Sequence, residues 1–325
     1  MIVPDEVRKC VAYVGYQTSD GQFHLGGTVF FVARQIEGTD RNFQYAITAR
    51  HVIEAITALG INRIYLRMNF SDGVARWVET NATQWRFHPA DKSVDVAVAR
   101  ILLTQEYDHL VYPLLSAATE GVIQEQGIGA GDEVFVTGLF ANHYGRQRNV
   151  PIVRVGNIAA MPEEPIDTKY GHIEAYLVEA RSIGGLSGSP VFVNLGVARY
   201  IDGGVKFSNS TAVYFLLGLM HGHYGTRLPD FDSNNPDVSD VERVNVGIAI
   251  VVPITKILEV INQPMMREEE RQTEEELRRK YLPTPDALPS SEQEQAGITR
   301  DQFFEALGKA ARPIQPQRDQ ENSET

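Results

Sequence analysis

The sequence has a single cysteine, Cys10, among its 325 residues. One cysteine cannot form a disulfide within the chain, and it cannot build a four-thiolate zinc site. The segment that begins at Met1 lacks a basic region followed by a long apolar run, so we expect no secretion signal. No stretch approaches the roughly 18 consecutive apolar residues of a membrane helix. These absences predict a cytoplasmic protein, not bound to a membrane, whose fold depends on its hydrophobic core.

Positive charge is also scarce. The chain has 30 Lys and Arg residues against 42 Asp and Glu residues, which gives a formal net charge of −12. A chain with this balance repels phosphate backbones and anionic lipid headgroups, so neither nucleic acid nor a membrane surface is expected as a partner. The 43% of hydrophobic residues is enough for the core of a globular protein.

Helical patterns are few over most of the chain, and strand patterns dominate. Short runs of β-branched and aromatic residues alternate with Gly, Asp, Asn and Pro from Val11 to about Val252, which is typical of an all-β protein. Two short helices are expected in this region, at Arg50–Leu59 and at 254–262, where Pro253 precedes the first turn. The segment from Gly222 to Asn245 is rich in aspartate and predicts an acidic surface loop.

The composition changes after Gln263, where charged residues and prolines become frequent. Acid-first pairs spaced four apart predict a solvent-exposed helix over Glu268–Lys280. A second helix is expected from Thr299, which can cap it, with Phe303 and Leu307 on its apolar side. This second helix needs a surface to pack on, either the body of the same protein or a regulatory partner protein. The tail is therefore predicted as residues 263–325, helical and partly flexible.

Three short motifs carry residues of catalytic type. The run Ile-Thr-Ala-Arg-His-Val puts His51 where a strand passes into a helix, and the run Ser-Val-Asp-Val-Ala-Val puts Asp95 at the head of a strand. The turn Gly-Gly-Leu-Ser-Gly-Ser-Pro holds Ser187. Each motif alone is compatible with an ordinary turn or strand end. Together they supply a nucleophile, a base and an acid that orients the base.

The glycines of the third motif are also explained by the chemistry of the predicted reaction. They let the main chain come close to a substrate carbonyl, so that the N–H groups of Gly185 and Ser187 can converge on a developing oxyanion. Leu186, between them, is expected to contribute only its main chain.

These motifs resemble those of the trypsin-like (chymotrypsin-fold) serine peptidases, in particular their disulfide-free bacterial branch. The segment ending at Val52 resembles the family's Thr-Ala-x-His, the strand from Asp95 its Asp-Leu-Ala-Leu, and the turn from Gly185 its Gly-x-Ser-Gly-Gly-Pro. The separations, 44 residues from His51 to Asp95 and 92 from Asp95 to Ser187, are also similar to the family's. Ser189 replaces a usual glycine. Leu186 replaces the aspartate of the digestive enzymes, so their activation switch is not expected.

The resemblance covers residues 8–262 and implies two antiparallel β-barrels followed by a C-terminal helix. The N-terminal barrel would span about 8–116, the C-terminal barrel about 117–252, and the closing helix 254–262. The active site would lie in the cleft between the barrels. His51 would act as general base, Asp95 would orient it, and Ser187 would attack the carbonyl of a protein or peptide substrate, with no metal or organic cofactor.

The substrate pocket is the least determined part of this interpretation. By resemblance, Arg181 lies near the base of the specificity pocket, where a cation would favour an acidic side chain, although an exposed arginine is the plainer alternative. The strand 216–222 would pair with the substrate main chain. His221 and His223 would line the pocket wall, and packing or metal binding are the alternatives for these two residues.

Other motifs are weaker. The run Gly-Ile-Gly-Ala-Gly that ends at Gly131 superficially resembles a phosphate loop but lacks the Gly-Lys-Ser/Thr ending. The nucleophile elbow of α/β-hydrolases fails at Ser189. The sequence thus predicts a regulated bacterial serine protease of the trypsin-like type. The alternative is a protease-fold binding or scaffold module whose cleft stays closed until a partner or effector opens it, as would suit a bacterial stress or antiviral defence system.

Overall fold

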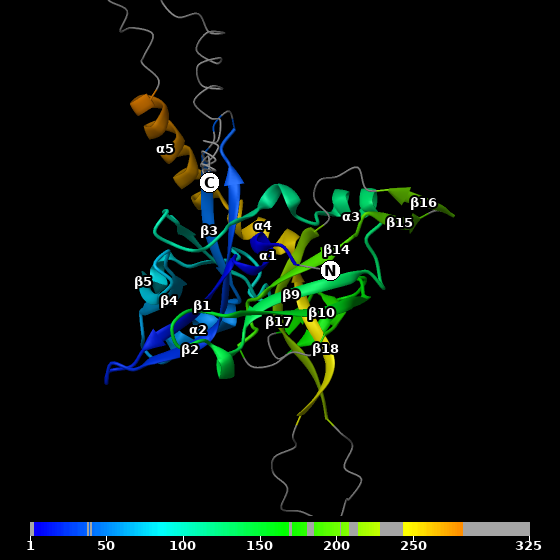
Figure 1. Cartoon of the computed structure of the whole chain (residues 1–325), viewed down its shortest axis with the longest axis horizontal. Coiled ribbons are helices and arrows are strands. Elements are labelled where there is room, and N and C mark those ends of the chain that lie inside the picture. Colours follow the sequence, from blue (N-terminus) through cyan, green and yellow to red (C-terminus); the bar gives the residue numbers. More distant parts are fainter. Residues whose placement is uncertain are drawn as a thin grey trace, which may run out of the picture. The chain divides into compact units, whose positions relative to one another are not determined.

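The computed structural model describes residues 3–37, 39, 41–168, 171–180, 185–201, 203–207, 214–227 and 243–281. Two β-sheets form most of this part of the chain (Figure 1). The chain divides into a unit of residues 1–272, which contains both sheets, and a second unit from Thr273 onward. No helix in the described part of the chain is both long and apolar enough to cross a membrane.

The first sheet is open and has eight strands in the order β5-β4-β1-β2-β3-β7-β6, with β8 paired parallel to β2 and the other neighbours antiparallel. Its strands are β1 (Val11–Gln17), β2 (Phe23–Gln35), β3 (Asn42–Thr48), β4 (Arg63–Asn69), β5 (Ala75–Asn81), β6 (Arg86–Phe87), β7 (Ala97–Ile101) and β8 (Tyr112–Pro113).

The closed barrel predicted over residues 8–116 is therefore corrected to an open sheet. The two edge strands, β5 and β6, do not pair with each other. Between them the chain turns through a 3₁₀ segment, Ala82–Gln84, which Asn81 and Gln84 cap reciprocally. β6 then has only two residues, too few to continue a ladder across the gap.

The second sheet closes into a six-stranded antiparallel barrel, as predicted, in the order β10-β13-β18-β17-β14-β9. Its strands are β9 (Glu133–Leu139), β10 (Pro151–Ala160), β13 (Tyr176–Glu179), β14 (Pro190–Asn194), β17 (Tyr214–Arg227) and β18 (Arg243–Pro253). Two small hairpins accompany it, β11 (Ile166–Thr168) with β12 (Gly171–Ile173), and β15 (Ala198–Ile201) with β16 (Gly204–Phe207). Buried aliphatic side chains from these strands, among them Val134, Val178 and Val251, form the barrel core.

The long hairpin of β17 and β18 differs from its prediction. The segment from Gly222 to Asn245 was expected to be an acidic loop, yet both of its ends continue the paired strands as far as Arg227 and back from Arg243 (Figure 1). Residues 228–242 lie outside the described residues. The β-branched and aromatic residues at the two ends of the segment are compatible with this extended ladder.

Five helices complete the described part of the chain: α1 (Asp5–Arg8), α2 (Arg50–Ala58), α3 (Glu120–Gln126), α4 (Ile254–Ile261) and α5 (Pro264–Tyr281). α2 and α4 confirm the two expected short helices. α5 confirms the helix predicted over Glu268–Lys280 but begins earlier, and Met266 and Glu270 in its first turns are buried. The start of this helix is therefore packed rather than fully exposed to solvent. The second predicted tail helix lies outside the described residues.

A buried polar cluster joins the open sheet to the barrel. Arg67 on β4 donates to the main-chain oxygens of Tyr144, Gly145 and Arg146, and to the side-chain oxygen of Asn149, before β10. Asn69 and Asn149 exchange hydrogen bonds, with the Asn149 N–H 2.7 Å from Asn69 Oδ1. Because every one of these bonds joins β4 to the segment between β9 and β10, the cluster fixes this connection of the barrel against the open sheet.

Candidate active site

His51 lies in the first turn of α2, directly after β3 ends at Thr48. Val52, Ile53 and Ile56 bury the inner face of this helix, which fixes the direction of its first turn. Ala49 precedes the helix in extended conformation and offers no side-chain cap. The first N–H groups of a helix have no hydrogen-bond partner within the helix, so an acceptor outside the helix must supply one.

Asp95 supplies that partner and holds the His51 ring at the same time. It lies just before β7, which pairs with β3 so that Thr48 faces Ala97 and the two site residues come close together. Asp95 Oδ1 accepts the His51 main-chain N–H at 2.8 Å, and Oδ2 lies 2.8 Å from His51 Nδ1. One carboxylate thus caps the helix and orients the imidazole.

The Asp95 carboxylate is buried, and burial by itself opposes ionisation. Hydrogen bonds from His221 and His51 outweigh burial and hold the pKa of Asp95 well below its usual range. Asp95 is therefore an anion at neutral pH. Because an ionised carboxylate only accepts hydrogen bonds, the Nδ1 atom of His51 carries the proton and its Nε2 is left as the basic nitrogen.

The turn that carries Ser187 is anchored through Leu186. The Leu186 side chain is fully buried in the barrel core, so this residue contributes more than the main chain that the sequence predicted. A Cβ atom on Gly138 of β9 would lie 2.4 Å from Leu186 Cδ2 and 2.2 Å from Ser189 Oγ. Only glycine at that position leaves room for the turn.

Threonines of the open sheet connect it to the same turn. Thr28 donates its hydroxyl to the main-chain oxygen of Gly185 at 2.7 Å, and its N–H to the main-chain oxygen of Ser187 at 2.9 Å. Gly188 has φ +84°, and a Cβ there would lie 2.3 Å from the oxygen of Thr28 and 2.4 Å from Oγ1 of Thr48. The turn therefore touches the strand that leads to His51.

The Ser187 hydroxyl points toward β17. Its Oγ lies 3.4 Å from the main-chain oxygen of His221, which is a long hydrogen bond. The Asp95 carboxylate contacts the rings of both His51 and His221, and the hydrogen bond described for the Ser187 hydroxyl goes to the His221 main chain rather than to the His51 ring. Within the described residues, no hydrogen bond engages the N–H of Ser187, one of the two predicted oxyanion donors.

His221 has a role that the sequence did not predict. Its Nδ1 lies 2.5 Å from Asp95 Oδ2, and its ring meets the His51 ring edge to face at a centroid distance of 5.4 Å. His221 is buried, whereas His223 is exposed and pairs with Ala249 of β18. No local pattern marks His221 as a partner of Asp95, because 126 residues separate them. The predicted pocket residue Arg181 lies outside the described residues.

The three residues also contain metal-binding atom types. One ligand atom from each of His51, Asp95 and His221 lies within 4.8 Å of the others, which is a two-nitrogen, one-oxygen donor set. In the structure the Nδ1 atoms of His51 and His221 are each at hydrogen-bonding distance from Asp95 Oδ2, so hydrogen bonds connect the three residues. Cys10 does not compete as a nucleophile, because it is buried and burial raises the pKa of its thiol to about 12.

No protein-family model matches the sequence, and no curated protein matches it either. Among solved structures, two are similar to this structure, and one of them is a protease domain. The MamO protease domain from Magnetospirillum magneticum is 15% identical with a TM-score of 0.47, and the match covers 78% of this chain and 96% of that one. Rv3671c from M. tuberculosis H37Rv, in an inactive form with a serine-to-alanine substitution, is 17% identical with a TM-score of 0.40, covering 78% and 87%.

Proposed function

We propose that the protein is a serine endopeptidase that acts inside the cell, with Ser187 as nucleophile, His51 as general base and Asp95 as the orienting group. The observation that carries this proposal is the two-point hold of Asp95 on His51, through the main-chain N–H and through Nδ1. An imidazole held in this way presents a basic Nε2 in a fixed direction, which general-base catalysis requires.

The proposed reaction has two halves that balance in protons. Ser187 Oγ attacks the peptide carbonyl while its proton passes to His51 Nε2, and His51 then gives that proton to the leaving amine. Water next attacks the acyl-enzyme, loses a proton to His51, and releases the acid while the proton returns to Ser187 Oγ. The negative charge on Asp95 stabilises the imidazolium formed in each half.

Before the first half, the Ser187 hydroxyl must turn away from the His221 main-chain oxygen and toward His51. A rotation about the side-chain χ1 bond moves Oγ without moving the turn, which Leu186 and Thr28 anchor. Catalytic hydrogen bonds in unliganded enzymes are often long and tighten only when substrate binds. The N–H groups of Gly185 and Ser187 would then hold the oxyanion.

The substrate main chain would pair with β17 beyond Met220 rather than along 216–222 as the sequence suggested. Residues 214–219 of β17 already pair with β14 on one side, and from Gly218 onward the other side pairs with β18. Beyond Met220 the described strand pairing of β17 is with β18 alone, and we propose that an extended peptide pairs along the other side of this segment. His223 lies on this segment, two residues after His221.

A fluorophosphonate probe read by intact mass tests the proposal, because it labels a serine only when its base and oxyanion donors are assembled. We expect one label on the wild type and none on Ser187→Ala. Ser189→Ala is the matched control, since Ser189 is buried in the same turn and its hydroxyl has no hydrogen-bond partner among the described residues. Labelling that persists in Ser187→Ala would reject the assignment.

The second candidate function is a binding module of protease fold, closed until a partner opens it. The contact between Ser187 Oγ and the His221 main-chain oxygen favours it, because a hydroxyl that donates its proton there does not donate it to His51. The same experiment separates the two functions. A closed module leaves both the wild type and Ser189→Ala unlabelled, while the active endopeptidase labels in both.

A further inference from the structure

The buried side chain of His221 has a hydrogen bond to the Asp95 carboxylate that no step of the proposed reaction uses. Oδ2 of Asp95 receives two imidazole Nδ1 groups, from His51 at 2.8 Å and from His221 at 2.5 Å, while Oδ1 receives the His51 main-chain N–H. All three donors converge on one buried carboxylate. Hydrogen bonds to a charged group in such surroundings are stronger than those between neutral groups.

The main chain of β17 is shaped to make this contact. The pairing of β17 with β18 shifts register between Met220 and Gly222, so His221 is the extra residue of a β-bulge. Bulges re-aim a side chain out of the regular alternation of a strand. The bulge is fixed from the other side, because Met220 exchanges main-chain hydrogen bonds with Gly188 and Ser189 in the serine turn. The direction of His221 is therefore built into the fold.

We propose that His221 is a positioning residue for the active site, which acts by fixing Asp95 through its Nδ1–H rather than by touching the substrate. This inference rests on the proposed endopeptidase function. Without the second donor, the Asp95 carboxylate could rotate, and the two-point hold on His51 would loosen. His221 thus contacts the two residues that would work with His51. Its side chain binds Asp95, and its main-chain oxygen lies beside Ser187 Oγ.

Two substitutions separate positioning from simple packing. His221→Leu keeps an apolar volume but removes the donor, whereas His221→Asn keeps an N–H donor the same number of bonds from the main chain as Nδ1. Neither changes the main-chain oxygen beside Ser187. We expect His221→Leu to lower kcat about tenfold to a hundredfold with little change in KM, and His221→Asn to recover most of the loss.

His172→Leu is the matched control. His172 also pairs with an aspartate, Asp167, but both side chains are exposed and lie on the β11–β12 hairpin. We expect its kcat and KM to equal those of the wild type. Equal kcat values in His221→Leu and the wild type would overturn the proposal, and so would a failure of His221→Asn to exceed His221→Leu.

Proton NMR gives a readout that does not depend on activity. In Ser187→Ala, two slowly exchanging imidazole Nδ1–H resonances are expected far downfield, one from each histidine on Asp95. Adding His221→Asn should remove one and leave the other. A single resonance before that change would overturn the proposal even if the enzyme labels with fluorophosphonate. An unlabelled wild type that shows both resonances would instead reject the endopeptidase function and retain the His221–Asp95 contact.

Discussion

Thr28 of β2 donates its hydroxyl to the main-chain oxygen of Gly185 at 2.7 Å, across 157 residues of sequence. The same hydroxyl accepts the N–H of Leu139 at 3.2 Å. One side chain of the open sheet thus bonds both to the serine turn and to β9 of the barrel. The turn geometry that the proposed chemistry needs therefore depends on a residue outside the three motifs.

Thr28→Val tests this dependence, because valine has the same shape without the hydroxyl. Gly185 and Leu139 would each lose a buried partner, so we expect a loss of about 1–3 kcal/mol in the free energy of unfolding and slower fluorophosphonate labelling. Urea denaturation and the labelling rate measure the two effects. Thr137→Val is the control, since the Thr137 hydroxyl is buried without a hydrogen-bond partner among the described residues. An equal loss in the two variants would contradict the role of Thr28.

Gly188→Ala should disrupt the serine turn. The residue has φ +84°, which disfavours a side chain, and the added Cβ would meet main-chain and side-chain oxygens at 2.3 and 2.4 Å. We expect labelling of Ser187 to be lost, with thermal unfolding reporting whether the rest of the fold remains. Gly196→Ala has a similar φ of +63° and open space around its Cβ, so it should cost only about 1 kcal/mol and keep labelling.

The start of α5 is held to the open sheet by a buried charge. Glu270 is 2% exposed and accepts hydrogen bonds from Arg34 of β2 at 3.0 and 3.2 Å. Arg34→Met would remove these bonds and leave the ion pair of Glu270 with Arg267, so we expect a loss of about 1–3 kcal/mol in the free energy of unfolding. Glu269→Gln is the control, because Glu269 is more exposed and its described ion pairs with Arg86 and Arg100 are long, 3.8 and 4.0 Å. Denaturant midpoints compare the two, and similar shifts would contradict a special role for Glu270.

The sequence was sufficient to predict features that depend on neighbouring residues. α2, α4 and α5 follow from local patterns, and the pairing of His51 with Asp95 follows from two motifs that end and begin adjacent strands. The second barrel was also predictable, through the resemblance. For the helices and for the His51–Asp95 pair, the residues that determine the structure lie within the motifs themselves.

Features set by distant parts of the chain could not be predicted. Closure of the first sheet depends on whether β5 and β6 meet, which no single segment encodes. The contact of His221 with Asp95 depends on a one-residue bulge in β17, and a strand pattern read with strict alternation cannot locate a bulge. Leu186 illustrates the same point, since its burial follows from the space that Gly138 leaves on another strand.

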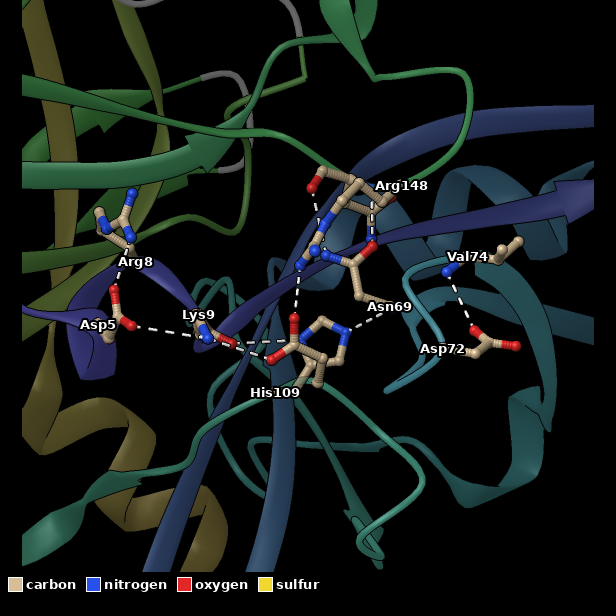
Figure 2. Close-up of polar contacts among 10 residues, drawn as sticks. Asp5, Arg8, Lys9, Asn69, Asp72, Val74, His109 and Arg148 are labelled. Atoms are coloured by element: carbon tan, nitrogen blue, oxygen red, sulfur yellow. Dashed lines mark hydrogen bonds and ion pairs between the residues drawn. The ribbon is translucent and has the colours of Figure 1, made fainter. Parts of the chain in front are cut away.

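A pH dependence of stability is expected from His109, which lies between Asn69 and Lys9 at the junction of the two sheets (Figure 2). Its Nε2 accepts the main-chain N–H of Asn69 at 2.7 Å, which only an unprotonated nitrogen can do. Burial lowers the pKa of His109 to about 4. In the unfolded chain the ordinary pKa is about 6.5, so between these values the unfolded state binds more protons and stability falls as the pH falls.

The contribution of His109 is thus fully present above about pH 6.5 and is lost progressively down to about pH 4, with a total of at most about 3 kcal/mol. His109→Gln keeps an acceptor for the Asn69 N–H but cannot titrate, so its free energy of unfolding should decline less steeply over this interval. Urea denaturation at pH 7, 6, 5 and 4 measures both slopes. The carboxylates that titrate in acid are the same in the wild type and in His109→Gln, so the difference between the two slopes isolates the contribution of His109. Parallel slopes would show that the His109 nitrogen is not protected from protons in the folded state.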